Sequence, residues 1–144
     1  MTLELRATPE ETMRAVEAFR EFARTQQIPE KTAFGLALAL EECGSNIVNH
    51  ALKRDAAQKF RVTFELAADE MFIELRDCGP EFDPTASTIS LTETHSDEPC
   101  GGWGIQLVRH YMDKVCYKRE GGENILRLGK RLTPASGAAE FQKS

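Results

Sequence analysis

Three polar side chains follow an apolar stretch in the first half of the sequence. Glu42, Asn46 and Asn49 are spaced i, i+4 and i+7, which places them on one face of a helix. The preceding residues 32–40 are rich in Ala and Leu, so this face emerges from a buried helix, where polar groups are costly unless they meet one another, solvent or a ligand. A carboxamide oxygen suits Mg²⁺, and Glu42 could accept a proton from an attacking hydroxyl. A helix end whose Asn side chains only cap or bond their neighbours is the alternative.

A second candidate is the segment Asp77-Cys78-Gly79-Pro80-Glu81-Phe82-Asp83-Pro84, which directly follows a strand-like pattern. An aspartate at the end of a strand can accept a hydrogen bond from an exocyclic amine such as that of adenine. Gly79 lets the backbone approach a flat ring closely. An ordinary turn built from Asp, Gly and Pro is the competing interpretation.

A third candidate is the run Gly101-Gly102-Trp103-Gly104-Ile105, which leads into a helical pattern. Glycines before a helix expose backbone N–H groups and the positive end of the helix dipole to a phosphate. The run matches neither the P-loop nor the GxGxxG spacing, and a flexible hinge is the alternative.

These candidates must be positioned by a fold that the remaining patterns predict. Thr8-Pro9-Glu10-Glu11 predicts a helix start with a capping box. The predicted order is a strand at 2–7, helices at 8–25 and 29–52, strands at 60–66 and 71–76, a long irregular section at 77–102, a helix at 103–112, and strands at 115–118 and 124–132. This order favours an α+β fold: a two-layer sandwich with a mixed, mainly antiparallel sheet and helices on one face. We expect one domain over 1–132 and a C-terminal tail at 133–144.

Composition narrows the class of protein. The chain has 144 residues, 41% of them hydrophobic and 28% charged, as expected for one globular domain. A net charge of −5 argues against nucleic-acid binding through bulk charge. No apolar run approaches the ~20 residues that span a bilayer, and the N-terminus lacks the pattern of a signal peptide, so we expect a cytoplasmic protein. Four cysteines without a CxxC pair predict free thiols, with Cys43 and Cys116 in the core.

Taken in order, the three candidates resemble the motifs of the GHKL (histidine-kinase-like) ATPase superfamily: Glu-x-x-x-Asn on a helix, Asp-x-Gly after a strand, and Gly-x-Gly at a helix. The length of the chain and the residues of its motifs are similar to those of the small serine kinases that act as anti-sigma factors in bacterial partner-switching systems. The resemblance runs from about Thr8 to Leu132 and includes the closing Gly122-Glu123-Asn124-Ile125-Leu126-Arg127-Leu128 strand.

The resemblance implies a site for ATP and Mg²⁺. It implies that Glu42 is the catalytic base and Asn46 the Mg²⁺ ligand, with Asn49 and His50 near the phosphates. It also implies that Asp77 reads adenine beside Gly79, and that Phe82 packs by the base or the lid. The phosphates would be held by Gly101, Gly102, Trp103, Gly104 and Ile105, with an ATP lid at about 85–100.

The function implied is a serine/threonine protein kinase that phosphorylates a small anti-anti-sigma (STAS-type) protein and binds a sigma factor or an analogous regulator. A homodimer through the first strand or helix is also implied. Two alternatives stay open. One is a nucleotide-gated binding module without significant kinase activity, in which ATP orders the lid. The other is an interaction domain in which the three motifs coincide by chance.

Overall fold

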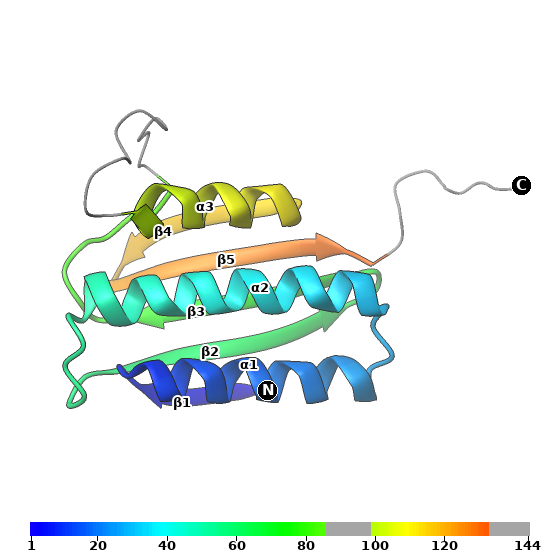
Figure 1. The fold of residues 1–144 in the computed structure, drawn as a ribbon, viewed down its shortest axis with the longest axis horizontal. Coiled ribbons are helices and arrows are strands. Elements are labelled where there is room, and N and C mark those ends of the chain that lie inside the picture. The colour runs from blue at the N-terminus through cyan, green and yellow to red at the C-terminus, as the bar shows by residue number, and fades with distance from the viewer. Residues whose placement is uncertain (86–98, 133–144) are drawn as a thin grey trace, which may run out of the picture.

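The computed structural model describes residues 1–85 and 99–132, with the backbone alone for 99–104. Three α-helices cover one face of a five-stranded sheet, and α2 lies between α1 and α3 (Figure 1). The elements are β1 (Thr2–Arg6), α1 (Pro9–Thr25), α2 (Glu30–Asn46), the π-helical turn η1 (Ile47–Ala51), β2 (Lys59–Ala67), β3 (Glu70–Asp77), α3 (Pro99–Tyr111), β4 (Lys114–Glu120) and β5 (Glu123–Arg131). The predicted two-layer α+β fold is confirmed.

The strand order is β1-β2-β3-β5-β4, and each pairing in the described sheet is antiparallel, so the expectation of a mixed sheet is wrong in that detail. The β4–β5 hairpin turns at Gly121 and Gly122, whose φ values of 59° and 80° suit a tight turn that glycine adopts without strain. The register places Asp77, at the end of β3, directly opposite Asn124 of β5. Two polar side chains far apart in the sequence therefore meet at one end of the sheet.

The α1 helix begins at Pro9 with Thr8 as its cap, but the predicted capping box is wrong in one bond, because Glu11 bonds the N–H of Arg6 instead of that of Thr8. The Thr8 side chain accepts a hydrogen bond from the backbone N–H of Glu11 at 3.2 Å, and the Glu11 carboxylate accepts one from the backbone N–H of Arg6 at 3.1 Å. Its apolar face packs on the sheet, where the rings of Phe19 and Phe64 meet edge to face at 5.2 Å. These contacts anchor α1 over β2.

The α2 helix is the centre of the helical layer, and two of its glycines allow close packing there. A Cβ on Gly35 would lie 2.9 Å from Cδ1 of Tyr111 in α3. A Cβ on Gly44 would lie 2.9 Å from Cγ2 of Thr12 in α1. Because Gly35 and Gly44 have no side chains, α3 and α1 pack closely against α2. The C-terminal end of α2 carries the first candidate motif.

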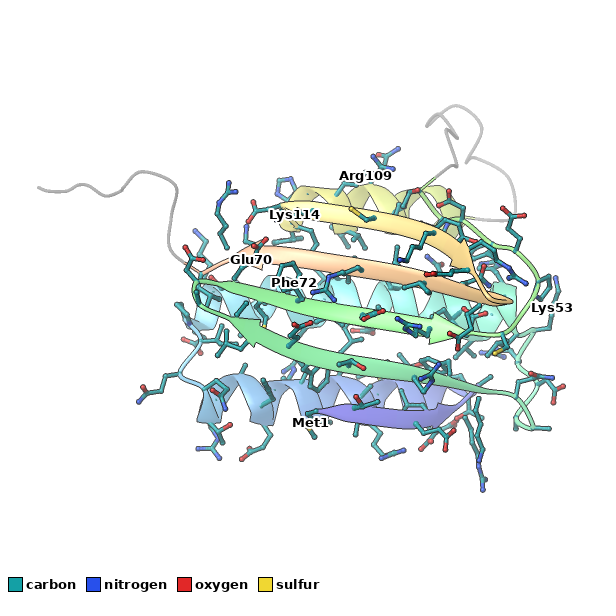
Figure 2. The ribbon with its side chains drawn as sticks, turned by 180° about the vertical axis from the view of Figure 1, so that it is seen from behind. Met1, Lys53, Glu70, Phe72, Arg109 and Lys114 are labelled. Atoms are coloured by element: carbon teal, nitrogen blue, oxygen red, sulfur yellow. The ribbon has the colours of Figure 1, made fainter. Side chains whose placement is uncertain are left out.

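The opposite face of the sheet carries charged side chains that pair with one another, seen from behind in Figure 2. The Arg76 guanidinium bonds Glu74 at 2.8 Å and Glu123 at 3.1 Å. The Arg127 guanidinium lies 4.2 Å from the centroid of the Phe72 ring. Because this face is polar, the sheet needs helices on one side only. Among the described residues, none of the helices has the length and apolar character that crossing a bilayer requires.

Two predicted boundaries are wrong. The helix predicted over 29–52 leaves α-helical geometry at Ile47, where the N–H of Leu52 bonds the carbonyl of Ile47 at 2.8 Å in an i→i+5 turn. Left-handed backbone at Lys53 and Arg54, with φ of 55° and 59°, then ends it. The α3 helix begins at Pro99 rather than at 103, because proline suits the first helical position.

Candidate functional site

Glu42 and Asn46 lie one turn apart near the C-terminal end of α2, and both are half-buried. No side-chain hydrogen bond reaches either residue from the described part of the chain. Burial, and then the neighbouring Glu41 carboxylate, raise the pKa of Glu42 above its ordinary value. The pair thus offers a carboxylate of increased basicity beside an uncommitted carboxamide.

Asn49 does not share this arrangement. The π-helical turn holds more residues than an α-helical turn, so Asn49 rotates off the line through Glu42 and Asn46. Its side chain is exposed, and its Oδ1 accepts a hydrogen bond from Nε of Arg54 at 2.8 Å. The prediction that all three residues share one α-helical face is therefore wrong for Asn49.

His50 links the end of the helix to the segment after β3. Its ring stacks on Phe82, with centroids 5.9 Å apart and an interplanar angle of 18°. Gly79 strengthens this junction, since a Cβ there would lie 2.8 Å from the carbonyl oxygen of Ala51 and 3.0 Å from Cδ2 of Leu52. The structure thus brings together the first and second candidate motifs, which the sequence separates.

Asp77 is the last residue of β3 and is 3% exposed. Its Oδ1 accepts hydrogen bonds from the backbone N–H of Gly79 at 2.8 Å and from Nδ2 of Asn124 at 2.9 Å. No hydrogen bond reaches Oδ2 from the part of the chain that the structure describes. One oxygen of a buried carboxylate is therefore fixed by the protein, and the other remains for a ligand.

Asn124 is the functional residue that sequence reasoning missed. It is 4% exposed, and its carboxamide uses both ends. Nδ2 donates to Asp77 and to the carbonyl of Pro80 at 2.9 Å each, while Oδ1 accepts from the N–H of Phe82 at 3.1 Å. The available signal was a polar residue directly before the apolar pair Ile125-Leu126 of the strand, and its partner depended on the sheet register.

The glycine run occupies the first turns of α3 instead of a loop before it. Gly101, Gly102, Trp103 and Gly104 are helical, and Ile105 is buried in the core at 4% exposed. In a helix that begins at Pro99, Gly101 is the one residue of the run among the first three positions, whose N–H groups have no intrahelical partner and suit a phosphate. From Gly102 on, the N–H groups fall where an α-helix bonds them internally, so the predicted phosphate donors are reduced. Of the predicted lid at 85–100, residues 86–98 lie outside the described part of the chain.

Of the cysteines, Cys43 is buried as predicted, and burial raises the pKa of its thiol to about 12. The prediction that Cys116 is a core residue is wrong, because Cys116 pairs with Arg127 on the polar face of the sheet and is exposed there, whereas Val115 and Tyr117 pack on the core. Cys78 is also an exposed free thiol. The side chain of Cys100 lies outside the described residues.

Comparison with known proteins agrees with this geometry. The family model for the histidine kinase-like ATPase domain matches residues 5–130. The chain is 30% identical over 136 residues to the serine/threonine-protein kinase BtrW of Bordetella bronchiseptica, covering 94% of this chain and 96% of that protein. It is 33% identical over 102 residues to the serine-protein kinase RsbW of Halalkalibacterium halodurans, covering 67% of this chain and 61% of that protein.

Two solved structures share the fold. One contains the RsbU and RsbW domains of Rv1364c from Mycobacterium tuberculosis, with a TM-score of 0.66 at 18% identity over 94% of this chain and 34% of that chain. The other is the SiaB–SiaC complex from Pseudomonas aeruginosa, with a TM-score of 0.58 at 12% identity over 90% of this chain and 88% of that chain. With the family model spanning nearly all of the described residues, the chain belongs to the histidine kinase-like ATPase family.

Proposed function

We propose that this chain is an ATP-dependent serine/threonine protein kinase of a partner-switching system. Its substrate would be a hydroxyl of a small STAS-type antagonist, and its second partner a sigma factor or an analogous regulator. The observation that carries the proposal is Glu42: a half-buried carboxylate with a raised pKa, one turn from Asn46. The relatives named as serine/threonine-protein and serine-protein kinases support the same activity.

Asp77 would read the adenine base. With Oδ1 committed to Gly79 and Asn124, Oδ2 is the oxygen that would accept a hydrogen bond from the exocyclic amine. The Phe82 ring, on the segment after β3, stacks on the His50 ring at the π-helical turn after α2. This stacked pair would border the nucleotide.

The phosphates would lie between the end of α2 and the start of α3. Asn46 fits a Mg²⁺ site because its carboxamide has no hydrogen bond from the described residues, and Mg²⁺ binds few protein groups while keeping waters and phosphate oxygens. When bound, Mg²⁺ would neutralise charge on the phosphates. The N–H group of Gly101 would donate to a phosphate oxygen, and Asn49 would contribute only if its bond to Arg54 opened.

Glu42 would act as the base in phosphoryl transfer. Its carboxylate takes the proton of the seryl or threonyl hydroxyl as that oxygen bonds to the γ-phosphorus. The bond from the γ-phosphorus to the β–γ bridging oxygen breaks, and ADP leaves with that oxygen. A raised pKa improves a carboxylate for this role, because a base works best when its pKa approaches the working pH.

The partners follow from the same proposal. A homodimer would use α1 or β1, and β1 is an edge strand of the sheet. We place the protein in the cytoplasm, where ATP, a STAS-type protein and a sigma factor are all present.

The test is an incubation of this protein with γ-labelled MgATP and a STAS-type protein encoded by a neighbouring gene. We expect label on one serine or threonine of the STAS-type protein, and no label when that residue is replaced by alanine. A complex that forms only with ATP but yields no phosphoprotein would overturn the kinase proposal and identify a nucleotide-gated binding module instead. Absence of any MgATP binding at millimolar nucleotide would contradict both functions.

A further inference from the structure

We infer that Asn124 is a positioning residue that sets the preference of this site for a 6-aminopurine over a 6-oxopurine. It acts through Asp77, whose Oδ1 it holds at 2.9 Å. The inference rests on the proposed function, because it concerns the base that Asp77 reads.

Asn124 fixes both the carboxylate and the segment around it. Its Nδ2 donates to Asp77 and to the carbonyl of Pro80, and its Oδ1 accepts from the N–H of Phe82. The Asp77 carboxylate and the backbone at Pro80 and Phe82 are thereby all bonded to one buried carboxamide. Since a buried carboxylate with one bonded oxygen does not rotate freely, Oδ2 keeps one direction.

Strand β4 secures the carboxamide in turn. The Tyr117 hydroxyl donates to Oδ1 of Asn124 at 2.6 Å, and Nη1 of Arg119 donates to the same oxygen at 3.1 Å. Arg119 also donates to the carbonyl of Gly79 at 2.7 Å. Burial, and then the Glu81 carboxylate, raise the pKa of Tyr117, so its hydroxyl remains a donor at neutral pH. With three donors on Oδ1, the amide is oriented so that Nδ2 faces Asp77.

The consequence is chemical selection at Oδ2. A 6-amino group donates to this oxygen, whereas a 6-oxo group presents lone pairs to a carboxylate that cannot turn away. A site built to bond an N–H rejects an analogue that lacks it, because its own buried group is left unpaired. Without Asn124 the carboxylate could rotate and find other partners, so discrimination would fall.

The test compares MgATP with MgITP, which carries the 6-oxo group, by calorimetric titration. Asn124→Leu has nearly the same volume and removes the donor to Asp77 without placing a second carboxylate beside it. We expect it to lower the ATP/ITP affinity ratio by about tenfold or more, the range of one hydrogen bond to a charged group. Asn124→Ala should lower the ratio similarly. Gln58→Leu is the matched control, because it makes the same replacement at an exposed carboxamide outside this network, and it should leave the ratio within about threefold.

The outcomes separate the positioning role of Asn124 from the adenine-reading role of Asp77. Equal weakening of ATP and ITP in both Asn124 variants would mean that Asn124 only supports the fold, and the inference would be overturned. Unchanged affinities for both nucleotides in the two variants would overturn it as well. If the unmodified protein binds ATP without preferring it to ITP, the adenine-reading role of Asp77 fails, and with it the basis of the inference. Thermal unfolding of each variant shows whether the titrated protein is folded.

Discussion

The segment after β3 and the end of α2 both carry polar side chains, but their bonding differs. Around Asp77 and Asn124 the side chains bond one another and the backbone, with distances of 2.6 to 3.1 Å. At the end of α2, Glu42 and Asn46 receive no hydrogen bond from the described chain. The first region is held in place by the protein itself and, in the proposed function, would recognise the base, whereas the second would be completed by MgATP. Affinity and chemistry are therefore expected to depend on different residues.

The largest expected effect comes from Asp77→Asn, which removes the carboxylate charge from the region around Asp77 and Asn124. The variant loses a charged acceptor for the base and brings an amide against the N–H groups of Gly79 and Asn124. We expect MgATP affinity to fall by about 100-fold, equivalent to about 3 kcal/mol. Calorimetric titration measures it, with Asp83→Asn as the control because Asp83 bonds only Thr85 among the described residues. Equal losses in the two variants would contradict a special role for Asp77.

Gly79→Ala tests the contact between the two regions. The new Cβ would lie 2.8 Å from the Ala51 carbonyl oxygen, so the backbone must move. We expect the free energy of unfolding to fall by about 1–3 kcal/mol and ATP affinity to fall with it. Gly121→Ala is the control, since its Cβ would meet nothing within 4 Å and only its φ of +59° is unfavourable. Both substitutions lower stability in urea unfolding, but only Gly79→Ala should weaken ATP binding.

Glu41→Gln should have the smallest effect on the transfer rate, and it tests only the end of α2 that carries Glu42 and Asn46. Glu42 must be deprotonated to act as a base, so the transfer rate rises with pH through the pKa of Glu42. Because this pKa is raised, the rise should occur above the ordinary value of 4.5. Removing the Glu41 charge removes the second cause of the increase, so the rise should move to lower pH, while burial keeps it above 4.5. A rise that stays in place, or moves to higher pH, would contradict the pairing of these carboxylates.

Much of this architecture was predictable from local patterns. Three local patterns each specify an element directly: the Thr8 cap followed by Pro9, the alternation in β2 and β3, and the paired glycines at 121–122. Asp77 follows from its place after an alternating strand. Glu42 and Asn46 follow from their offset on a helix whose apolar face precedes them.

The remainder depends on hydrogen bonds and strand pairings that no local periodicity encodes. The π-helical turn is secured by the N–H of Arg54 on the carbonyl of Val48, six residues away, which no helical periodicity reveals. Asn124 meets Asp77 across 47 residues, and only the register of β3 and β5 defines that pair. The same dependence explains Cys116, whose pairing with Arg127 of β5 places it on the polar face of the sheet.

The most direct test of the central claim is single-turnover phosphoryl transfer by Glu42→Gln, saturated with MgATP, to the STAS-type partner. The substitution preserves size but removes the base. We predict that MgATP affinity stays within about threefold of the unmodified protein while the transfer rate falls by about 100-fold or more, within the range that general base catalysis contributes. Transfer at the unmodified rate would contradict the account, because the carboxylate at the end of α2 would then have no part in the chemistry.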